Sequence, residues 1–539
     1  MSIRPLYILI LLIVATSARA QHAATPGDTV LKGTTIEVIQ SYKPQVKQVP
    51  KPEWVPQIPP ADTSHPKFKY DVPLQTLYYT YSSQPLRPLA LGIDSGKLPF
   101  PNYVKVGAGN LSTLFLDAGI GGITGRNYET AIHLHHISQQ GDLKYQQTAL
   151  SGIEAEGLLH KANNDWHAAI IGERNQYYYY GFPDNESKDS LKQVYTTIRA
   201  VVDMANRDSG DSKLSYHPSV SASVYDAKFN ASETNIGFNA PFLYKMDSAL
   251  QFQVALTGAL THFSANLENT NNNYIELLPG IQFNKPNISG HALLGLAEGK
   301  NSNGYILPDV VANVPIASTG LMASAGWQAS LRQNTYEQLT TENPYLYTNY
   351  NVTQTRRDEV FLNLAGSTGQ HLTWSGRLSW RAYNDLPTYL NNIGNEKQFF
   401  VDYQQVRAVS LQLAARYQVA NTWSAGISGD FYDFYQSTDK HVWQQPDTKI
   451  KGDFTILPLP KLTITAYLAV LGGIYAESTS LQAIKLKTIT DLGGNAEYQF
   501  IPRLSAFVQV SNLLNDKYQR WMGYQAYGLN LYGGLRLKF

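Results

Sequence analysis

The sequence predicts an all-β fold: a transmembrane antiparallel β-barrel of about 22 strands, within a range of about 18 to 22. Three observations predict it. Apolar and polar residues alternate along many segments, short and long connections between these segments also alternate, and tyrosine is unusually frequent. The 539 residues include 36 tyrosines and only 16% charged residues, where a soluble globular chain averages about 25% charged. Low charge with many aromatic residues is typical of a wall that faces lipid on one side and water on the other.

Alternation is explicit throughout residues 102–539. In residues 250–263 one face carries Leu250, Phe252, Val254, Leu256 and Leu260. The segments 371–383, 504–511 and 529–539 repeat this pattern. A period of two indicates strands with one apolar and one polar face, and no long stretch shows the period of an amphipathic helix. Residues 102–539 contain 22 such segments, with roughly 20 residues for each strand and its connection.

The connections follow a rhythm along the chain. Those after even-numbered segments are short, as at Met246-Asp247 and Lys285-Pro286. Those after odd-numbered segments are longer, as at residues 182–189, 335–353 and 385–399. Alternation of this kind is typical of a transmembrane barrel with short periplasmic turns and longer extracellular loops.

The N-terminal hundred residues predict two further regions. Arg4, the apolar run 6–14 (LYILILLIV) and Ala18-Arg19-Ala20 have the order of a secretory signal peptide, which we assign to residues 1–20. The alternative is a short N-terminal helix. Residues 21–101 are proline-rich, with PQVKQVPKPEWVPQIPP at 44–60. Since proline fixes φ and removes a hydrogen-bond donor, we expect a periplasmic tail or linker before the barrel of residues 102–539.

Composition excludes several classes of protein. The 43 basic and 42 acidic residues leave a net charge of +1, without the basic excess of a nucleic-acid-binding protein. The absence of cysteine excludes disulfides, thiolate metal sites and cysteine nucleophiles. No G-x-S-x-G elbow or other catalytic spacing occurs. We therefore expect no enzyme, no cofactor and no nucleic-acid partner.

The C-terminus carries a specific pattern. Residues 507–518 read FVQVSNLLNDKY, and residues 533–539 read GGLRLKF. This resembles the last two strands of TonB-dependent outer-membrane receptors, especially those of Bacteroidota. The resemblance implies a Gram-negative outer-membrane location and a role in solute transport or reception. It also implies that the alternating strand with Leu535, Leu537 and Phe539 is the assembly signal read by the outer-membrane insertion machinery.

One departure from that family concerns the N-terminus. The receptors carry a plug of well over a hundred residues within the barrel, but residues 21–101 here show no plug-like succession of strands and helices. The chain therefore looks like a plugless relative. Residues 30–39 (VLKGTTIEVI) are an alternative: a vestigial energy-coupling box or plug strand. A further alternative function is a non-transporting scaffold or assembly partner, with residues 21–100 binding a periplasmic or membrane protein.

The run Tyr177, Tyr178, Tyr179 and Tyr180 precedes a long predicted loop. Barrels place aromatic girdles where the wall leaves the bilayer, because an aromatic ring with a polar edge suits the interface. The run therefore predicts an outer girdle. The alternative is a platform on which a ligand stacks.

Histidines and carboxylates occupy the polar faces of three neighbouring segments. They are His133, His135, Glu154, Glu156 and His167. Imidazole and carboxylate groups can bind a divalent cation together. The alternative is an ordinary polar lumen wall, and no spaced metal motif favours the cation.

Four arginines have positions that we expect to face the lumen: Arg377, Arg381, Arg407 and Arg416. Pore-lining arginines can select anionic solutes. The alternative is that they pair with lumen carboxylates such as Asp430 or Glu359.

Overall fold

The computed structural model describes residues 102–182, 186–207, 212–265, 268–316, 320–348, 352–478 and 480–539. All of them lie within the region 102–539 that the sequence predicts to be a barrel. The predicted signal peptide, the proline-rich region and the segment 30–39 lie outside the described residues.

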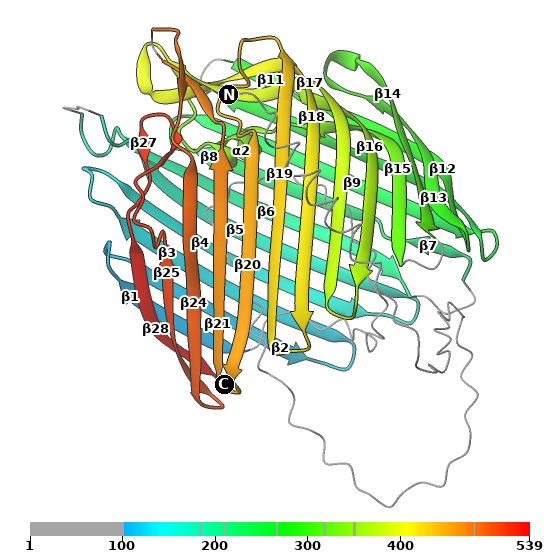
Figure 1. Cartoon of the computed structure of the whole chain (residues 1–539), viewed down its shortest axis with the longest axis horizontal. Helices are drawn as coiled ribbons and strands as arrows, with labels where there is room; N and C mark the ends of the chain where they lie inside the picture. The colour runs from blue at the N-terminus through cyan, green and yellow to red at the C-terminus, as the bar shows by residue number, and fades with distance from the viewer. Residues whose placement is uncertain are drawn as a thin grey trace, which may run out of the picture. The chain divides into compact units, whose positions relative to one another are not determined.

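The described residues form one large antiparallel sheet (Figure 1). Its first half contains β1 (Tyr103–Gly109), β2 (Leu114–Thr124), β3 (Tyr128–Gln140), β4 (Gln147–His160), β5 (Asn164–Tyr178), β6 (Lys192–Asn206), β7 (Leu214–Tyr216), β8 (Ser219–Ala227), β9 (Ala231–Lys245), β10 (Leu250–Ala265), β11 (Glu268–Asn271), β12 (Tyr274–Lys285) and β13 (Ile288–Glu298). Its second half contains β14 (Gly304–Ile316), β15 (Leu321–Gln333), β16 (Gln354–Thr368), β17 (Leu372–Asn392), β18 (Asn395–Val419), β19 (Trp423–Ser437), β20 (Thr448–Leu459), β21 (Leu462–Gly472), β24 (Ile489–Ile501), β25 (Leu504–Ser511) and β28 (Asn530–Lys538).

The sheet closes on itself, because β1 pairs with β28 from Tyr103↔Lys538 to Gly109↔Tyr532. The wall has 22 strands, as predicted, although the sheet has 24 labelled members. β7 and β8 pair in succession with β9, and β11 and β12 pair in succession with β10, so each of these couples fills one position in the wall. Closure leaves no sheet edge with unpaired backbone groups.

The alternation in the sequence separates the two faces of the wall. In β16, Val360 and Leu362 are 47% and 64% exposed on the outer face, whereas Glu359 and Phe361 between them are 2% and 5% exposed. Isoleucine, leucine and valine recur on the outer face of most strands. A contiguous apolar exterior around a partly polar interior matches the pattern of a barrel in lipid. No described helix has the length and hydropathy of a transmembrane helix.

The two ends of the barrel differ as the rhythm predicts. One end, which we call the turn end, has short connections at residues 125–127, 161–163, 286–287 and 502–503. The opposite end, which we call the loop end, has longer connections at residues 179–191, 334–353, 438–447, 473–488 and 512–529. The short helices η1 (Lys300–Ser302) and α2 (Tyr336–Glu342) lie in loop-end connections. So do two small hairpin sheets, β22 (Tyr475–Glu477) with β23 (Ala483–Lys485), and β26 (Gln519–Trp521) with β27 (Tyr524–Gln525).

The prediction of a loop at residues 385–399 is wrong. β17 and β18 continue their ladder to Asn392↔Asn395, past a register shift between Tyr383 and Leu386. Asp385 takes a left-handed conformation at this shift, with φ of 60°. Asp, Asn, Gly and Pro in this stretch resemble a loop in composition, but the bulge accommodates them within a longer hairpin.

Candidate functional site

A segment that we call the lid, residues 334–348, lies at the loop end and contains α2. Thr335 begins the helix by accepting a hydrogen bond from the backbone N–H of Gln338 at 3.1 Å, and Glu337 lies in the first turn. A Thr N-cap and an early acidic residue are typical of a helix start. The side chains of Tyr336 and Leu339 are buried, so this short helix depends on tertiary packing.

Although the lid arises between β15 and β16, it is anchored to strands far along the wall. The Glu233 carboxylate on β9 accepts hydrogen bonds from the backbone N–H groups of Tyr336 and Glu337, at 2.6 and 3.3 Å. The Glu337 carboxylate pairs with Arg199 of β6 at 2.7 Å. These contacts hold α2 against the inner faces of β6 and β9.

A second anchor joins the lid to β18. The backbone N–H of Phe399 donates to the carbonyl of Tyr345 at 3.0 Å, and the N–H of Tyr347 donates to the carbonyl of Phe399 at 2.7 Å. Leu346 and Phe399 thereby form a parallel β-bridge. The lid is thus held at both ends by main-chain or charge-assisted hydrogen bonds.

An aromatic cluster fills the space between the lid and the other loops. The Tyr345 ring stacks on Tyr524 with centroids 3.5 Å apart, and Tyr180 meets Tyr524 edge-on at 5.2 Å. The cluster further includes Tyr179, Tyr195, Tyr225, Phe263, Tyr336, Tyr389, Phe399 and Trp521. Closely packed rings and aliphatic groups leave no room for water inside this cluster, which we call the seal.

The girdle prediction for the tyrosine run is wrong, because Tyr178, Tyr179 and Tyr180 are only 5–7% exposed. Tyr177 packs, partly buried, against the same aromatic cluster. Burial raises the pKa of Tyr179 and Tyr180, so their hydroxyls stay neutral. Sequence cannot separate an outward from an inward aromatic run where the strand ends, because alternation stops there.

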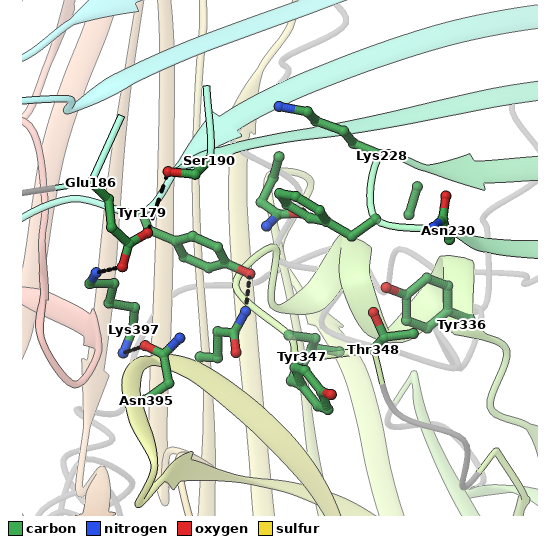
Figure 2. Close-up of a pocket in the computed structure, with 15 residues that line it drawn as sticks. Tyr179, Glu186, Ser190, Lys228, Asn230, Tyr336, Tyr347, Thr348, Asn395 and Lys397 are labelled. Carbon is green, nitrogen blue, oxygen red and sulfur yellow. Dashed lines mark hydrogen bonds and ion pairs between the residues drawn. The ribbon is translucent and has the colours of Figure 1, made fainter. Parts of the chain in front are cut away.

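Beside the lid lies a pocket of about 360 Å³ (Figure 2). Figure 2 shows the ring of Tyr179 crossing its middle, with Tyr336 and Tyr347 of the lid on one side. The walls come from the β5–β6 connection, the β8–β9 turn, the lid and the first residues of β18. The other lining residues are Glu186, Ser190, Gln193, Ala227, Lys228, Phe229, Asn230, Leu346, Thr348, Asn395, Lys397 and Gln398.

The charges around the pocket are balanced. The ammonium of Lys397 pairs with Glu186 at 2.8 Å, and that of Lys228 pairs with Asp189 at 3.0 Å. The Gln398 amide donates to the hydroxyl of Tyr179 at 3.2 Å. Aromatic faces, amides and hydroxyls together can bind a ligand of mixed polarity.

The predicted histidine and carboxylate cluster divides into separate pairs. His133 contacts Asp117 at 3.1 Å. The ring centroid of His135 lies 5.6 Å from that of His133. Glu154 stands opposite His133 in the β3–β4 register. His167 contacts Asp203 at 2.7 Å and Glu156 at 3.4 Å.

Within the described ranges, no three histidine or acidic side chains are placed to hold a metal ion together. The geometry of these pairs matches the alternative interpretation, a polar lumen wall.

Two of the four arginines pair with a buried carboxylate. Arg377 and Arg381 lie 3.1 and 3.0 Å from the same oxygen of Glu359. They belong to what we call the inner belt, a chain of hydrogen bonds and ion pairs along the inner faces from β13 to β19: His291, Asp309, Gln328, Arg377, Glu359, Arg381, Gln412 and Asp430.

The other two arginines differ from each other. Arg416 pairs with Asp453 at 2.8 Å. The prediction for Arg407 is wrong, since it is exposed and shares its face of β18 with the outward Val409 and Leu413.

The C-terminal residues lie on the seam between β1 and β28. Leu535 and Leu537 are each 50% exposed on the outer face of β28, and Phe539 follows the strand with 60% exposure. The backbone N–H of Phe539 donates to the carbonyl of Asn102 at 3.2 Å. Their role as an assembly signal stays a prediction.

Similar solved structures share this architecture. They include the FrpB iron transporter from Neisseria meningitidis, with 10% identity over 82% of each chain and a TM-score of 0.64. The ferripyoverdine receptor of the outer membrane of Pseudomonas aeruginosa shows 11% identity over 82% of this chain and 72% of its own, with a TM-score of 0.61. The chain has the fold of an outer-membrane receptor barrel. The copper transporter OprC gives the same picture, with 10% identity over 82% of this chain and 81% of its own and a TM-score of 0.61. No family model and no curated protein matches the sequence.

The lid and the pocket were not foreseen from the sequence. Thr335 followed by Glu337 is a local helix-start signal inside the predicted loop 335–353 that could have indicated α2. No local signal indicates that α2 packs against β6 and β9.

Proposed function

We propose that the chain is an outer-membrane barrel, resembling TonB-dependent receptors, that receives a solute at its loop end and passes it through the lumen. The observation that carries this proposal is the lid over the lumen with a pocket of mixed polarity beside it. The apolar outer face supports insertion in a bilayer. Solved barrels of the same fold are described as transporters and receptors, which supports the same class of role.

The rhythm of the connections supports one orientation. Transmembrane barrels of this kind keep short turns in the periplasm and longer loops outside the cell. The lid and the pocket would then face the exterior, where a solute arrives. The turn end, near which Tyr103 and Phe539 lie, would face the periplasm.

The closed lid supports a gated passage instead of an open pore. The seal of Tyr180, Tyr345 and Tyr524 is buried, and water does not enter so apolar a contact. Transport would therefore require the lid to leave β6, β9 and β18.

Planar-bilayer recording tests this function. The purified wild-type barrel should conduct rarely, and the Tyr345→Ala, Tyr524→Ala double variant should conduct far more often, because it lacks the stacked pair. Recording both with and without residues 21–100 separates the lid from the N-terminal region. Absence of conductance in all four proteins would overturn the transport proposal.

A second candidate function is the scaffold, which a sealed loop end equally favours. It requires a protein partner for the proline-rich segment 44–60. Affinity purification from membranes should then recover a partner that is lost when residues 44–60 are deleted. Recovery of the barrel alone from both proteins would exclude this function.

A third possibility, energy-coupled uptake, requires residues 30–39. Wild-type uptake after their deletion would exclude it.

A further inference from the structure

Two aromatic rings at the pocket beside the lid are exposed. Phe229, in the β8–β9 turn, is 39% exposed, and Tyr347, in the lid, is 43% exposed. Neither ring belongs to the seal, which includes the buried Tyr179 and Tyr336 of the same pocket. The pocket therefore offers aromatic surface on which the apolar face of a bound molecule can pack.

A buried amide nitrogen in the pocket wall lacks a partner. Gln193 of β6 lines the pocket and is 3% exposed, and its Nε2 has no hydrogen-bond partner in the described part of the chain. Buried amide groups almost always have a partner, so this donor indicates an acceptor that the described side chains do not supply. Further amide and hydroxyl groups in the lining belong to Ser190, Asn230, Thr348, Asn395 and Gln398.

The charged groups that line the pocket are already paired. Figure 2 shows the ion pair between the ammonium of Lys397 and the carboxylate of Glu186, at 2.8 Å. The ammonium of Lys228 pairs with Asp189 at 3.0 Å. A charged solute would have to break one of these pairs or enter the pocket without a counter-ion, and either would cost binding free energy. An uncharged solute meets neither cost.

We propose that the pocket binds an uncharged, hydroxyl-rich solute with the chemistry of a mono- or disaccharide. Each sugar hydroxyl donates and accepts, as the amide and hydroxyl groups of the pocket do, and the C–H face of a sugar ring packs on an aromatic ring. The volume of about 360 Å³ lies near the lower end of the range for small-molecule sites. A small peptide or an organic acid carries charged groups, whose partners here are already engaged. The sugar would be the solute that the proposed transport function receives, and its assignment rests on that function.

The bound solute would touch the lid. Leu346 and Tyr347 of the lid line the pocket. Lys397 and Gln398, which also line it, come directly before Phe399, whose main chain holds the lid on β18. A solute in the pocket would therefore contact both segments of the bridge that must open for passage.

Saturation-transfer NMR on the full-length barrel tests this assignment, in lauryldimethylamine oxide, a detergent without a sugar headgroup. The probes are glucose, galactose, mannose, maltose and cellobiose. At least one of them should receive saturation from the barrel. The uronic acid and the amino sugar with the same ring as the tightest-binding sugar add only a charge, and they should bind at least about tenfold more weakly.

Substitutions in the pocket should weaken sugar binding. Gln193→Met removes the unpaired donor at similar side-chain length, and Phe229→Ala and Tyr347→Ala each remove an exposed ring. Each should lower the affinity by about threefold to tenfold. The matched control is Tyr435→Ala, which removes a 53% exposed ring outside the pocket that accepts a hydrogen bond from Trp380, and it should leave the affinity unchanged. Migration on unheated detergent gels checks that each variant is folded.

Absence of transfer to all of these sugars, tighter binding of a charged analogue, or equal affinity in wild type and the pocket variants would each overturn the assignment. Conductance in the planar-bilayer test without sugar binding would overturn it and leave the transport function in place. Sugar binding without conductance would support the sugar site and overturn transport.

Discussion

The rings of Tyr345 and Tyr524 stack with centroids 3.5 Å apart and planes inclined by only 8°. Tyr345 belongs to the lid, and Tyr524 belongs to the connection between β25 and β28. This pair therefore joins one side of the loop end to the other. Both residues are less than 10% exposed, so the contact is a part of the seal and not of the solvent-exposed surface.

Loss of either ring should loosen the lid. We expect Tyr345→Ala to destabilise the folded loop end by about 3 to 5 kcal/mol, as for other large aromatic truncations. A double-mutant cycle with Tyr524→Ala should give a coupling of about 0.5 to 1.5 kcal/mol. Hydrogen exchange of the backbone amides in residues 336–348 measures the free energy of opening in each variant, and so gives both the destabilisation and the coupling. Additive effects of the two substitutions would show that the stacking contributes nothing of its own.

Glu359 should be the most sensitive member of the inner belt. Its carboxylate is 2% exposed and accepts from Arg377, Arg381 and Ser379. Glu359→Gln leaves two buried guanidinium groups without their counter-ion, which should cost about 3 to 5 kcal/mol. Thermal unfolding of the barrel in detergent measures this.

The control for that variant is Asp453→Asn. It breaks the exposed pair with Arg416 and should cost less than about 1 kcal/mol. Similar losses in both variants would contradict the role assigned to burial.

The closing seam should not tolerate a side chain at Gly534. Gly534 stands opposite Gly107 in the β1–β28 pairing, and a Cβ built at Gly534 would lie 1.8 Å from the carbonyl oxygen of Val106. Gly534→Ala should therefore strain or open the seam, at a cost of about 1 to 3 kcal/mol. The folded fraction on unheated detergent gels measures this. Gly304→Ala is the control, because nothing lies within 4 Å of its Cβ; equal folded fractions would contradict the prediction.

Acid should stabilise the loop end around Glu477. Burial, together with the charges of Asp439 and Asp402, raises the pKa of Glu477, so Glu477 takes up a proton at higher pH than an ordinary glutamate. The stability that this gives is present below the pKa of an ordinary glutamate and is lost as pH rises through the raised pKa. Thermal unfolding in detergent between about pH 4 and pH 7 should show this loss in the wild type and a smaller one in Glu477→Gln. The same pH dependence in both proteins would assign the effect to other groups.

The fold followed from alternation, because residues 250–263 or 504–511 repeat a period of two that only a strand satisfies. Strand boundaries could be predicted wherever a turn interrupts this period. The boundary prediction is wrong at residues 385–399, because the ladder between β17 and β18 continues past a bulge at Asp385. The prediction for Arg407 is wrong because Arg407 shares its face of β18 with Val409 and Leu413, which lie on the outer face of the wall.

Less of the candidate site than of the fold could be predicted from the sequence. The pairing of Arg377 and Arg381 with Glu359 was foreseen as one alternative, since neighbouring strands bring inward charges together. The lid was not, because the contacts of Glu337 with Arg199 and of Tyr345 with Tyr524 join residues more than a hundred positions apart. Only the folded barrel defines such neighbours.

The central claim is that the lid closes the loop end and must move for a solute to pass. Because the chain has no cysteine, Leu346→Cys and Phe399→Cys can form a disulfide across the bridge that seats the lid on β18. Single-channel current of this variant, recorded oxidised and then after reduction with dithiothreitol, is the most direct measurement. If the lid must move, the oxidised variant should show no channel openings, and openings should appear after reduction. Recordings that are the same in both states, whether silent or conducting, would contradict it.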